Sequence, residues 1–484
     1  MEKTTIPAPS LRSAGQFIVK EILHESIAAR TATIGVIGLG YVGLPLAVQL
    51  AEHFKVIGVD ISSRRIETVN NGRSYIGDVE SERVARVVKS GHLQATDDDA
   101  ALGQCDCVII CVPTPLGPGK QPDISHILNA GRAIANHLRR GQLVILESTT
   151  YPGTTDEKLL PLLSERGFEL DRDFLLAFSP ERIEPGNPDF HVDEIPKVVG
   201  GCSADSTEIA CELYREVTKE VYPVSSARVA EACKLWENTF RSVNIALANE
   251  MAILCQRFGI ESSEVIEAAT TKPFGFMPFY PGPGVGGHCI PLDPLYLSWK
   301  ATEHGYIPDL IMVSDQINAS MPDYIITLTT DALNNAAPPR GLRGARILII
   351  GVSYKAGVED TRHSPAISII DRLRTKGSIV SYHDPYVPHL EIHEHDLPPA
   401  PRRDMREIPT ERRVKDVESE HTRRRTDPLT SVALTDQILQ NSDCVIVVSA
   451  HASIDFARIG RCAPLVVDSR NAMPYDLKAR IIRL

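Results

Sequence analysis

The sequence lacks the features that mark membrane proteins, secreted proteins and nonspecific nucleic-acid-binding proteins. In 484 residues, no apolar run approaches the roughly 18 residues that a membrane-spanning helix needs. The first 30 residues have no apolar core of a secretory signal. The net charge of −11 argues against nonspecific binding to nucleic acid. We therefore expect a cytoplasmic protein with no membrane insertion and no nucleic-acid partner.

A regular cysteine framework is also absent. The ten cysteines follow no fixed spacing, which argues against a set of structural disulfides. Cys105, Cys107 and Cys111 lie in "CDCVIICVP", which has the apolar pattern of a buried strand. Because free cysteine packs readily in a core, we expect core packing there rather than the alternative of metal ligation. No metal site is predicted.

Apolar strand patterns alternate with helical patterns along most of the chain. From Thr31 they read "TATIGVIG", "KVIGVDIS", "CVIICVP", "LVILEST" and "FLLAFSP", and a second set begins at Arg346 with "RILIIGVSY". Such alternation favours parallel sheets covered by helices. Between the two sets, apolar residues recur every three or four positions from Val229 to Gln256. We predict an α/β fold with two Rossmann-like doubly wound domains joined by a long central helix.

The stretch "GLGYVG" contains a G-x-G-x-x-G pattern at Gly38, Gly40 and Gly43. It follows a strand pattern, opens a helical pattern, and precedes Asp60 at the end of the next strand. Gly38 permits a tight turn, Gly40 lets a pyrophosphate approach the backbone, and Gly43 permits close helix packing. Asp60 accepts hydrogen bonds from ribose hydroxyls and repels a 2′-phosphate, which predicts NAD as the cofactor; the alternative is a glycine turn without a ligand. The predicted cofactor loop also contains Leu39, Tyr41 and Val42.

Residues 279–294, "FYPGPGVGGHCIPLDP", surround Cys289 with glycine and proline. These residue types disfavour both a regular helix and an inner strand. A thiolate attacks carbonyl carbons and can hold an acyl group as a thioester. Beside a nicotinamide cofactor, this chemistry predicts oxidation of an alcohol to an aldehyde, addition of Cys289, oxidation to a thioester, and hydrolysis to a carboxylate. We expect the glycines to leave room for the substrate.

Several motifs, in this order, resemble those of the UDP-glucose/GDP-mannose dehydrogenase family. They are "GVIGLGYVGLPLA", "ICVPTP", "ESTTYPGTT", "SPERIEPGN", "EACKLWENTFRSVNIALANE", "GPGVGGHCIPLDP" and "GVSYKAGVEDTRHSP". The resemblance covers roughly residues 31–392 and 429–475. The stretch from Lys272 to Ala301 is most similar to the branch that oxidises UDP-N-acetylhexosamines, UDP-N-acetylglucosamine in particular. The resemblance adds Pro113 and Thr114 to the expected cofactor site.

The resemblance implies a set of catalytic residues. Cys289 would be the nucleophile, and Asp293 together with Thr150 would bind or activate water. Lys234 would stabilise the developing oxyanion, with Asn238 one helical turn further along. Residues at i and i+4 of a helix can point into one pocket, and a cation aimed at a developing alkoxide is a strong form of catalytic stabilisation.

Glu181 of "SPERIEPGN" would act as general base in thioester hydrolysis. Each role has a structural alternative: a solvated helix face for Lys234 and Asn238, a helix cap for Glu181, and a turn for Asp293. For His288 we expect a structural or substrate-lining role rather than an ion pair with Cys289, because adjacent side chains point apart.

By the same resemblance, the second α/β unit would bind a UDP-hexosamine substrate. It has no G-x-G-x-x-G pattern of its own, so a second dinucleotide site is not expected. The family also implies a homodimer with the long helix at its interface, or a higher homo-oligomer, although the apolar stripe of that helix fits internal packing equally well. The expected substrate-binding residues are Phe279, Tyr280, Gly284, Tyr354, Lys355 and Arg470.

The predicted domains are an N-terminal extension at 1–30, an NAD-binding domain at 31–224, a central helical domain at 225–335, and a UDP-sugar-binding domain at 336–484. The extension is expected to add an amphipathic helix around Phe17 and Leu23. Residues 393–428 carry mixed charges and five prolines, which predicts a flexible surface insertion; a docking site for a regulator is the alternative.

The expected function is NAD-dependent oxidation of C6 of UDP-N-acetylglucosamine to a carboxylate. UDP-glucose and UDP-N-acetylmannosamine are alternative substrates for the same chemistry. A two-electron hydroxyacid dehydrogenase would share the N-terminal fold and the long helix but would need neither Cys289 nor the C-terminal unit. A catalytically silent nucleotide-binding scaffold is a further alternative, against which the presence of Cys289, Lys234 and Asp293 argues.

Overall fold

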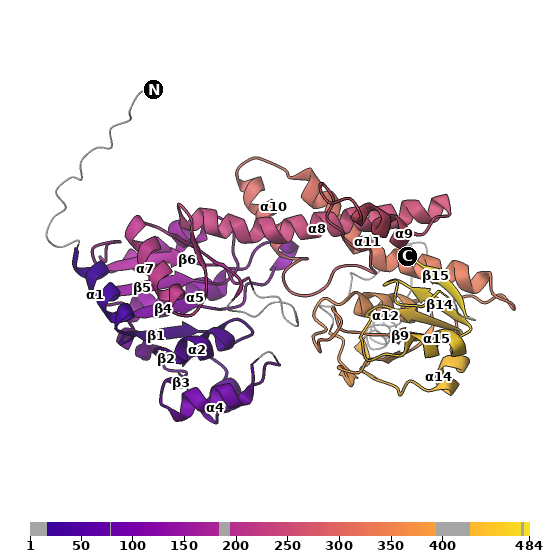
Figure 1. Ribbon diagram of the computed structural model, residues 1–484, viewed down its shortest axis with the longest axis horizontal. Helices are drawn as coiled ribbons and strands as arrows, with labels where there is room; N and C mark the ends of the chain where they lie inside the picture. The colour runs from indigo at the N-terminus through magenta and orange to yellow at the C-terminus, as the bar shows by residue number, and fades with distance from the viewer. Residues whose placement is uncertain (1–16, 78, 183–193, 394–425, 476–478) are drawn as a thin grey trace, which may run out of the picture. The chain divides into compact units, whose positions relative to one another are not determined.

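The computed structural model describes residues 17–77, 79–182, 194–393, 426–475 and 479–484 (Figure 1). The chain folds as two compact units, which we call unit 1 (Met1–Glu237 with Leu295–Tyr306) and unit 2 (Asn238–Pro294 with Ile307–Leu484). Residues 1–16 and nearly all of the predicted insertion at 393–428 lie outside the described residues. Among the described residues, no helix has the length and apolar character needed to cross a membrane.

Unit 1 is built on one twisted sheet whose strands run in the order β3-β2-β1-β4-β5-β6-β7-β8. Neighbouring strands are parallel except for β6 and β7. The order reverses between β1 and β4, which is the point where doubly wound folds bind their ligands. The strands are β1 (Thr33–Ile37), β2 (Lys55–Val59), β3 (Leu93–Thr96), β4 (Cys107–Ile110), β5 (Gln142–Leu146), β6 (Phe174–Phe178), β7 (Lys197–Gly201) and β8 (Val221–Pro223).

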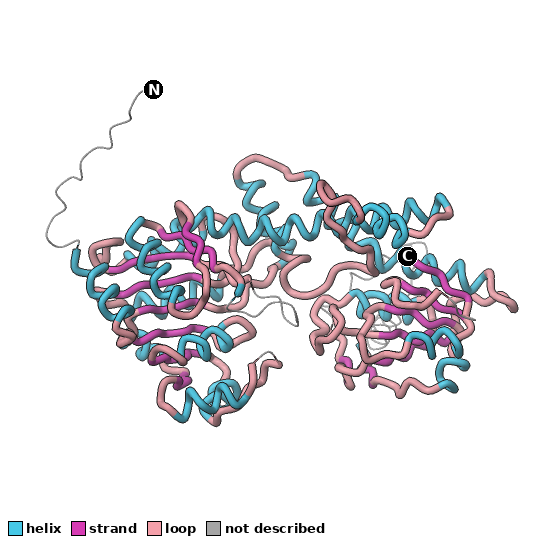
Figure 2. The backbone as a smooth tube through the Cα atoms, in the orientation of Figure 1, coloured by secondary structure: helices cyan, strands magenta, loops and turns pink. Residues whose placement is uncertain are grey.

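Helices cover the sheet of unit 1, as the ribbon and tube views show (Figures 1 and 2). The central strands read as continuous apolar runs because both of their faces are buried. In β4, Cys107 and Ile109 pack into one core cluster while Val108 and Ile110 pack into another. The helices are α1 (Phe17–Ala28), α2 (Gly43–Ala51), α3 (Ser63–Asn70), α4 (Ser81–Lys89), η1 (Asp99–Gln104), η2 (Pro118–Lys120), α5 (Ser125–His137), η3 (Thr154–Leu159), α6 (Leu160–Ser164) and α7 (Ala204–Arg215).

Helix α1 confirms the amphipathic helix predicted in the N-terminal extension. Its residues Val19, Leu23 and Ile27 are buried in the same core cluster as Ile209 and Leu213 of α7. Lys20 of the same helix forms ion pairs with Asp205 and Glu208 of α7. The helix is therefore part of the hydrophobic core of unit 1.

Unit 2 is built on a second parallel sheet, with strand order β10-β9-β13-β14-β15. Numbered along this unit, the order is 2-1-3-4-5, a common doubly wound arrangement. The strands are β9 (Arg346–Ile350), β10 (Ile379–His383), β13 (Cys444–Val447), β14 (Leu465–Asp468) and β15 (Arg480–Arg483), with a short antiparallel pair of β11 (His389–Leu390) and β12 (Leu429–Thr430). The helices are α9 (Ser262–Thr270), α11 (Asp309–Asn334), α12 (Pro365–Thr375), α14 (Asp436–Asn441) and α15 (Phe456–Cys462).

The long central helix predicted from the sequence is α8 (Ala227–Phe258). Ser226 accepts a hydrogen bond from the backbone amide of Val229 at its start, as an N-cap residue does. Gly259, with φ of +72°, follows its last turn and supplies the left-handed conformation that commonly ends a helix. The predicted fold class, two Rossmann-like doubly wound units joined by a long helix, is confirmed. The boundaries of the predicted domains stay a prediction.

Candidate functional site

The glycine turn after β1 has the geometry of a dinucleotide-binding loop. Gly38 has φ of +89°, and a Cβ there would overlap the backbone carbonyl of Cys111 at the point where the strand order reverses. A Cβ on Gly43 would overlap the carbonyl oxygen of Gly38, so only glycine lets α2 begin this close to the turn. A Cβ on Gly40 would meet nothing within 4 Å, which leaves open space where a pyrophosphate approaches in this fold.

Asp60 lies at the end of β2 and is 5% exposed. Its carboxylate accepts hydrogen bonds from the backbone amides of Leu39 (2.7 Å) and Ser62 (2.8 Å) and forms an ion pair with Arg65 at 3.3 Å. The contact with Leu39 ties the acid directly to the glycine turn. The turn, the strand-end acid and the start of α2 together fit an NAD molecule, with Asp60 at the ribose and the amides of α2 at the phosphates.

The rest of the predicted cofactor set lines the same strand ends. Tyr41 is 49% exposed, whereas Leu39 and Thr114 are buried. The backbone carbonyl oxygens of Thr114 and Pro115 accept hydrogen bonds from the hydroxyl of Tyr296 at 2.9 and 3.0 Å. Val42 is half-buried and Pro113 is exposed.

Two alanine substitutions in the glycine turn should separate cofactor binding from folding. We expect Gly40→Ala to leave the melting temperature unchanged and to raise the Kd for NAD by about tenfold or more, because the new methyl group occupies space beside the pyrophosphate. Gly43→Ala should instead lower the free energy of unfolding by about 1–3 kcal/mol, the usual cost of overpacking. Calorimetric titration with NAD and thermal unfolding measure the two effects; unchanged NAD affinity in Gly40→Ala would contradict the assignment of the turn.

The predicted catalytic residues fall into two groups, one in each unit. In unit 2, Cys289 is exposed and is not part of a disulfide. Its backbone carbonyl accepts hydrogen bonds from the amides of Leu292 (3.1 Å) and Asp293 (2.9 Å), so the thiol stands on a tight turn that leads into helix α10 (Asp293–Glu303). Asp293 is 4% exposed and accepts a 2.5 Å hydrogen bond from the side-chain amide of Asn238 on α8.

His288 occupies a different environment from its neighbour Cys289. It is half-buried, and burial, together with the nearby charges of Arg362 and His363, lowers its pKa below the ordinary value of histidine. The adjacent amide of Gly287 donates to the backbone carbonyl of Arg362 at 3.0 Å. These contacts tie residues 279–294, which we call the cysteine loop, to the loop that follows β9.

The glycines of the cysteine loop serve packing within unit 2. A Cβ on Gly286 or Gly287 would come within 2.8 Å of Tyr354, and one on Gly282 within 2.5 Å of the guanidinium of Arg470. The expectation that these glycines leave room for substrate is therefore wrong at three positions, because protein side chains fill that space. The sequence alone cannot reveal this, since Tyr354 and Arg470 lie far along the chain.

These contacts bring most of the predicted substrate-binding residues of unit 2 to one region. The side chain of Arg470 donates to the backbone carbonyl of Val448 at 2.8 Å, and burial lowers its pKa to about 10. Gly284 (φ +128°) packs against Pro365. Tyr354 and Lys355 are half-buried, and Tyr280 is 60% exposed. Phe279 makes an edge-to-face contact with Phe240 of α8.

The second group, in unit 1, contains Lys234, Glu181 and Thr150. The ammonium of Lys234 on α8 donates a 2.5 Å hydrogen bond to the backbone carbonyl of Glu181, so the structure brings these two residues together. The carboxylate of Glu181 accepts hydrogen bonds from the amide of Arg182 (2.7 Å) and from Lys197 (3.1 Å). Thr150 is fully buried, and its hydroxyl is hydrogen-bonded to that of Thr154 at 2.6 Å.

Glu231 is a residue of this group that the sequence reasoning missed. Its buried carboxylate accepts hydrogen bonds from the amides of Gly153 (2.6 Å) and Thr155 (2.8 Å) and from the hydroxyl of Thr155 (2.6 Å). It thereby fixes the loop after Thr150 onto the helix that carries Lys234. Burial raises its pKa to about 7. The sequence offered one signal for Glu231, namely its position three residues before Lys234 in the motif "EACKLWEN".

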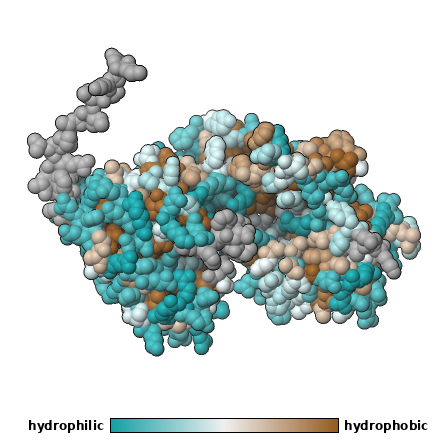
Figure 3. Space-filling model, in the orientation of Figure 1, coloured by the Kyte–Doolittle hydropathy of each residue, from teal (hydrophilic) through white to brown (hydrophobic). Residues whose placement is uncertain are grey.

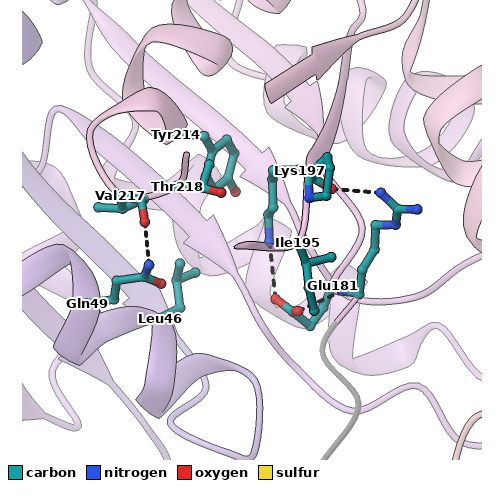
Figure 4. A pocket seen from close by; sticks show the side chains of 10 residues that line it. Leu46, Gln49, Glu181, Ile195, Lys197, Tyr214, Val217 and Thr218 are labelled. Carbon is teal, nitrogen blue, oxygen red and sulfur yellow. Dashed lines mark hydrogen bonds and ion pairs between the residues drawn. The ribbon is translucent and has the colours of Figure 1, made fainter. Parts of the chain in front are cut away.

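A pocket lies beside Glu181 in unit 1 (Figure 4). Figure 4 shows Glu181 and Lys197 facing each other on one side of it, with Gln49 bonded to the carbonyl of Val217 on the other. Lys197 also forms an ion pair with Glu147. Neither Lys197 nor Glu147 was predicted from the sequence. The pocket is lined by Leu46, Gln49, Glu181, Arg182, Ile195, Pro196, Lys197, Tyr214, Val217 and Thr218. Among the described residues, no group of histidine, cysteine, aspartate and glutamate side chains is arranged to hold a metal ion.

Comparison with known families matches three consecutive parts of the chain. Residues 32–218 match the NAD binding domain, residues 228–320 the central domain, and residues 348–475 the UDP binding domain of the UDP-glucose/GDP-mannose dehydrogenase family. A UDP-N-acetyl-D-glucosamine 6-dehydrogenase from Pseudomonas aeruginosa is 38% identical over 370 residues, which cover 76% of this chain and 86% of that protein. A UDP-N-acetyl-D-mannosamine dehydrogenase from Pyrococcus horikoshii is 39% identical over 358 residues, 73% of this chain and 84% of that protein.

Solved structures of UDP-sugar dehydrogenases also align with most of this chain. The UDP-D-ManNAc dehydrogenase of Pyrococcus horikoshii aligns with a TM-score of 0.78 and 33% identity, covering 93% of this chain and 99% of that one. A UDP-N-acetyl-mannosamine dehydrogenase from Staphylococcus aureus aligns with a TM-score of 0.74 and 28% identity, covering 93% of this chain and 98% of that one.

Proposed function

We propose a specific reaction for this chain, which belongs to the UDP-glucose/GDP-mannose dehydrogenase family and uses NAD: oxidation of C6 of UDP-N-acetylglucosamine to a carboxylate. The observation that carries the proposal is the turn that presents the exposed Cys289 four residues before a buried Asp293 held by Asn238. A nucleophile on such a turn can accept an aldehyde carbon and retain it as a thioester.

The proposed reaction balances as two oxidations and one hydrolysis. NAD, when bound, accepts a hydride in each oxidation. The C6 alcohol becomes an aldehyde, and the thiol of Cys289 adds to its carbonyl carbon to give a thiohemiacetal, which is oxidised to a thioester. Water then attacks the thioester carbon, the carbon–sulfur bond breaks, and Cys289 regains its thiol. The net reaction converts one UDP-sugar, two NAD⁺ and one water into the 6-carboxylate, two NADH and three protons.

We assign the remaining roles by family resemblance together with the contacts in each unit. Lys234 stabilises the oxyanion, and its buried position and fixed hydrogen bond suit a preorganised charge. Asn238 orients Asp293, which binds or activates water, as does Thr150. Glu181 takes a proton from the water that attacks the thioester.

The UDP portion is assigned to unit 2. Burial removes solvating water from the guanidinium of Arg470 and so disfavours its charged form. The negative charge of a diphosphate would compensate for that loss, which makes Arg470 suitable for binding the diphosphate. Tyr354 and Lys355 border the same loop, and Phe279 and Tyr280 offer aromatic surface to the base or sugar. This assignment corresponds to the proposed domain division, with NAD at 31–224, the cysteine loop at 225–335 and UDP at 336–484.

UDP-N-acetylglucosamine is proposed as the preferred sugar because two relatives, at 38% and 36% identity, are named for its 6-dehydrogenation. The relative from Pyrococcus horikoshii is named for UDP-N-acetyl-D-mannosamine. Measuring kcat/KM for UDP-N-acetylglucosamine, UDP-N-acetylmannosamine and UDP-glucose tests the choice. The proposal expects the first to be highest; a higher value for either of the others would reassign the substrate and leave the chemistry unchanged.

A homodimer formed through α8 is part of the proposal. The helix exposes a row of apolar side chains, and Figure 3 shows hydrophobic surface over its C-terminal end. Exposed apolar patches of this kind commonly mark protein interfaces. Successive residues of the row are three, four or seven positions apart, so all of them lie on one face of the helix. The exposed residues are Val229, Trp236, Phe240, Leu247, Met251, Leu254 and Phe258.

Replacing both Leu247 and Met251 with aspartate should convert the dimer to a monomer. Both side chains are exposed in the single chain, at 55% and 44%, so the fold should tolerate the change, while two charges in an apolar interface remove its favourable burial. Light scattering after size-exclusion chromatography measures the mass. Ile379→Asp, on β10 and also exposed, is the matched control and should leave the mass unchanged. A wild-type monomer would contradict the proposed interface.

A further inference from the structure

Lys197 lies between two carboxylates inside unit 1. Its ammonium forms a close ion pair with Glu147. It forms a second one with Glu181 at 3.1 Å, which Figure 4 shows. The exposed fractions of the three side chains are 12% for Lys197, 0% for Glu147 and 16% for Glu181. The lysine therefore connects the proposed general base at the rim of the pocket to a fully buried acid.

Glu147 is a fixed anchor for this lysine. It follows β5 directly, and its carboxylate accepts hydrogen bonds from the hydroxyl of Tyr214 on α7 (3.1 Å) and the thiol of Cys111 after β4 (3.4 Å). The ammonium of Lys197 also lies 5.1 Å from the centre of the Tyr214 ring. Three secondary-structure elements thus hold Glu147 and Lys197 in one arrangement.

The protonation of Lys197 follows from its neighbours. Burial alone lowers the pKa of the lysine, but the charges of Glu147 and Glu181 outweigh it and leave the pKa raised. Burial raises the pKa of Glu147, against the lowering effect of Lys197. The raised pKa favours the charged form of Lys197 beside Glu181.

The backbone of Glu181 is held independently of Lys197. Its carbonyl accepts a hydrogen bond from Lys234, and the next residue, Arg182, is fixed by an ion pair with Glu237 (2.7 Å) and by a hydrogen bond to the carbonyl of Pro196 (2.7 Å). Lys197 thus acts on the carboxylate itself, at Oε2, while the amide of Arg182 donates to Oε1. Removing Lys197 should take away this partner of Oε2 without releasing the chain that carries the carboxylate.

We propose that Lys197, anchored by Glu147, is a positioning residue that holds the Glu181 carboxylate correctly oriented for hydrolysis of the Cys289 thioester. The proposal rests on the function proposed above. In that step the water oxygen bonds to the thioester carbon, Glu181 accepts one water proton, and the sulfur leaves with the electron pair of the broken bond. A carboxylate that rotates away cannot accept this proton, so hydrolysis slows while both oxidations proceed.

The test compares the wild-type enzyme with the variants Lys197→Met and Lys197→Met/Glu147→Gln. The single substitution leaves two carboxylates without their shared cation and can prevent folding. The double variant also replaces the buried carboxylate of Glu147, so no unpaired charge remains at that position. We expect the double variant to release two NADH per active site in a rapid first turnover and then to turn over about 10- to 100-fold more slowly. Intact-protein mass spectrometry should find the UDP-hexuronyl group bound to Cys289.

Two controls complete the design. Lys219→Met changes an exposed lysine that pairs with Glu194 and should behave as the wild-type enzyme. Lys197→Arg keeps the positive charge and should therefore retain most of the wild-type steady-state rate, unlike Lys197→Met. Turnover of the double variant at the wild-type rate, or a uniform slowing of all steps without a covalent adduct, would overturn the role of Lys197. The wild-type arm tests the proposed function separately, because one NADH per sugar there would contradict the thioester route itself.

Discussion

Cys289→Ser should lower the steady-state rate of carboxylate formation by more than about 1,000-fold, since loss of a catalytic nucleophile removes most of an enzyme's rate enhancement. Serine is protonated at neutral pH and is a far weaker nucleophile than a thiolate. The variant cannot hold the aldehyde carbon as a thiohemiacetal, so the second oxidation loses its substrate. Residual activity should release less than two NADH per sugar.

The structure predicts that this loss is chemical and not a failure to fold. Cys289 is exposed, and its turn is formed by its backbone carbonyl with the amides of Leu292 and Asp293, so the melting temperature should stay close to the wild-type value. Cys462→Ser, at a half-buried position on α15, is the matched control and should keep full activity. Two NADH per sugar under steady turnover in Cys289→Ser would rule out the covalent route.

Lys234→Met should lower kcat by about 100- to 1,000-fold, the range found when a preorganised oxyanion partner is removed. Lys234 is 8% exposed, and its ammonium is oriented by the carbonyl of Glu181, so its charge acts in a site with little screening by water. Because the negative charge develops on the oxygen bonded to the reacting carbon only as the reaction proceeds, KM for the UDP-sugar should change little. Methionine matches the length of lysine and limits the packing change.

Pre-steady-state kinetics distinguish this effect from that of Lys197. Loss of Lys234 should slow the first NADH release, whereas loss of Lys197 should leave it fast and slow only the hydrolysis. Lys89→Met, at the exposed end of α4, is the control substitution. A normal first turnover in Lys234→Met would contradict its role at the oxyanion.

Local patterns in the sequence were sufficient to predict the fold class. The apolar runs of β1, β4, β5 and β9 indicated parallel strands, and the uninterrupted helix formers before Gly259 indicated α8. The edge strands β8 and β15 are short and incompletely buried, and neither was predicted. Their pairing depends on neighbours in the sheet more than on their own sequence.

The site was predictable where one motif carries both partners, as in the glycine turn and in the Cys289–Asp293 turn. It was not predictable where partners come from distant strands. Glu147 and Lys197 are 50 positions apart and meet only because β5, β6 and β7 are neighbours in the sheet. The glycines of the cysteine loop show the same limit, since what they contact lies in the segments after β9 and β14.

The ratio of NADH formed to UDP-N-acetylglucosamine consumed by the wild-type enzyme tests the central claim most directly. It is measured by absorbance at 340 nm while chromatography follows the sugar. The account predicts a ratio of two, with the 6-carboxylate as the only accumulating product. A ratio of one, with an aldehyde or ketone as product, would contradict a four-electron oxidation through Cys289.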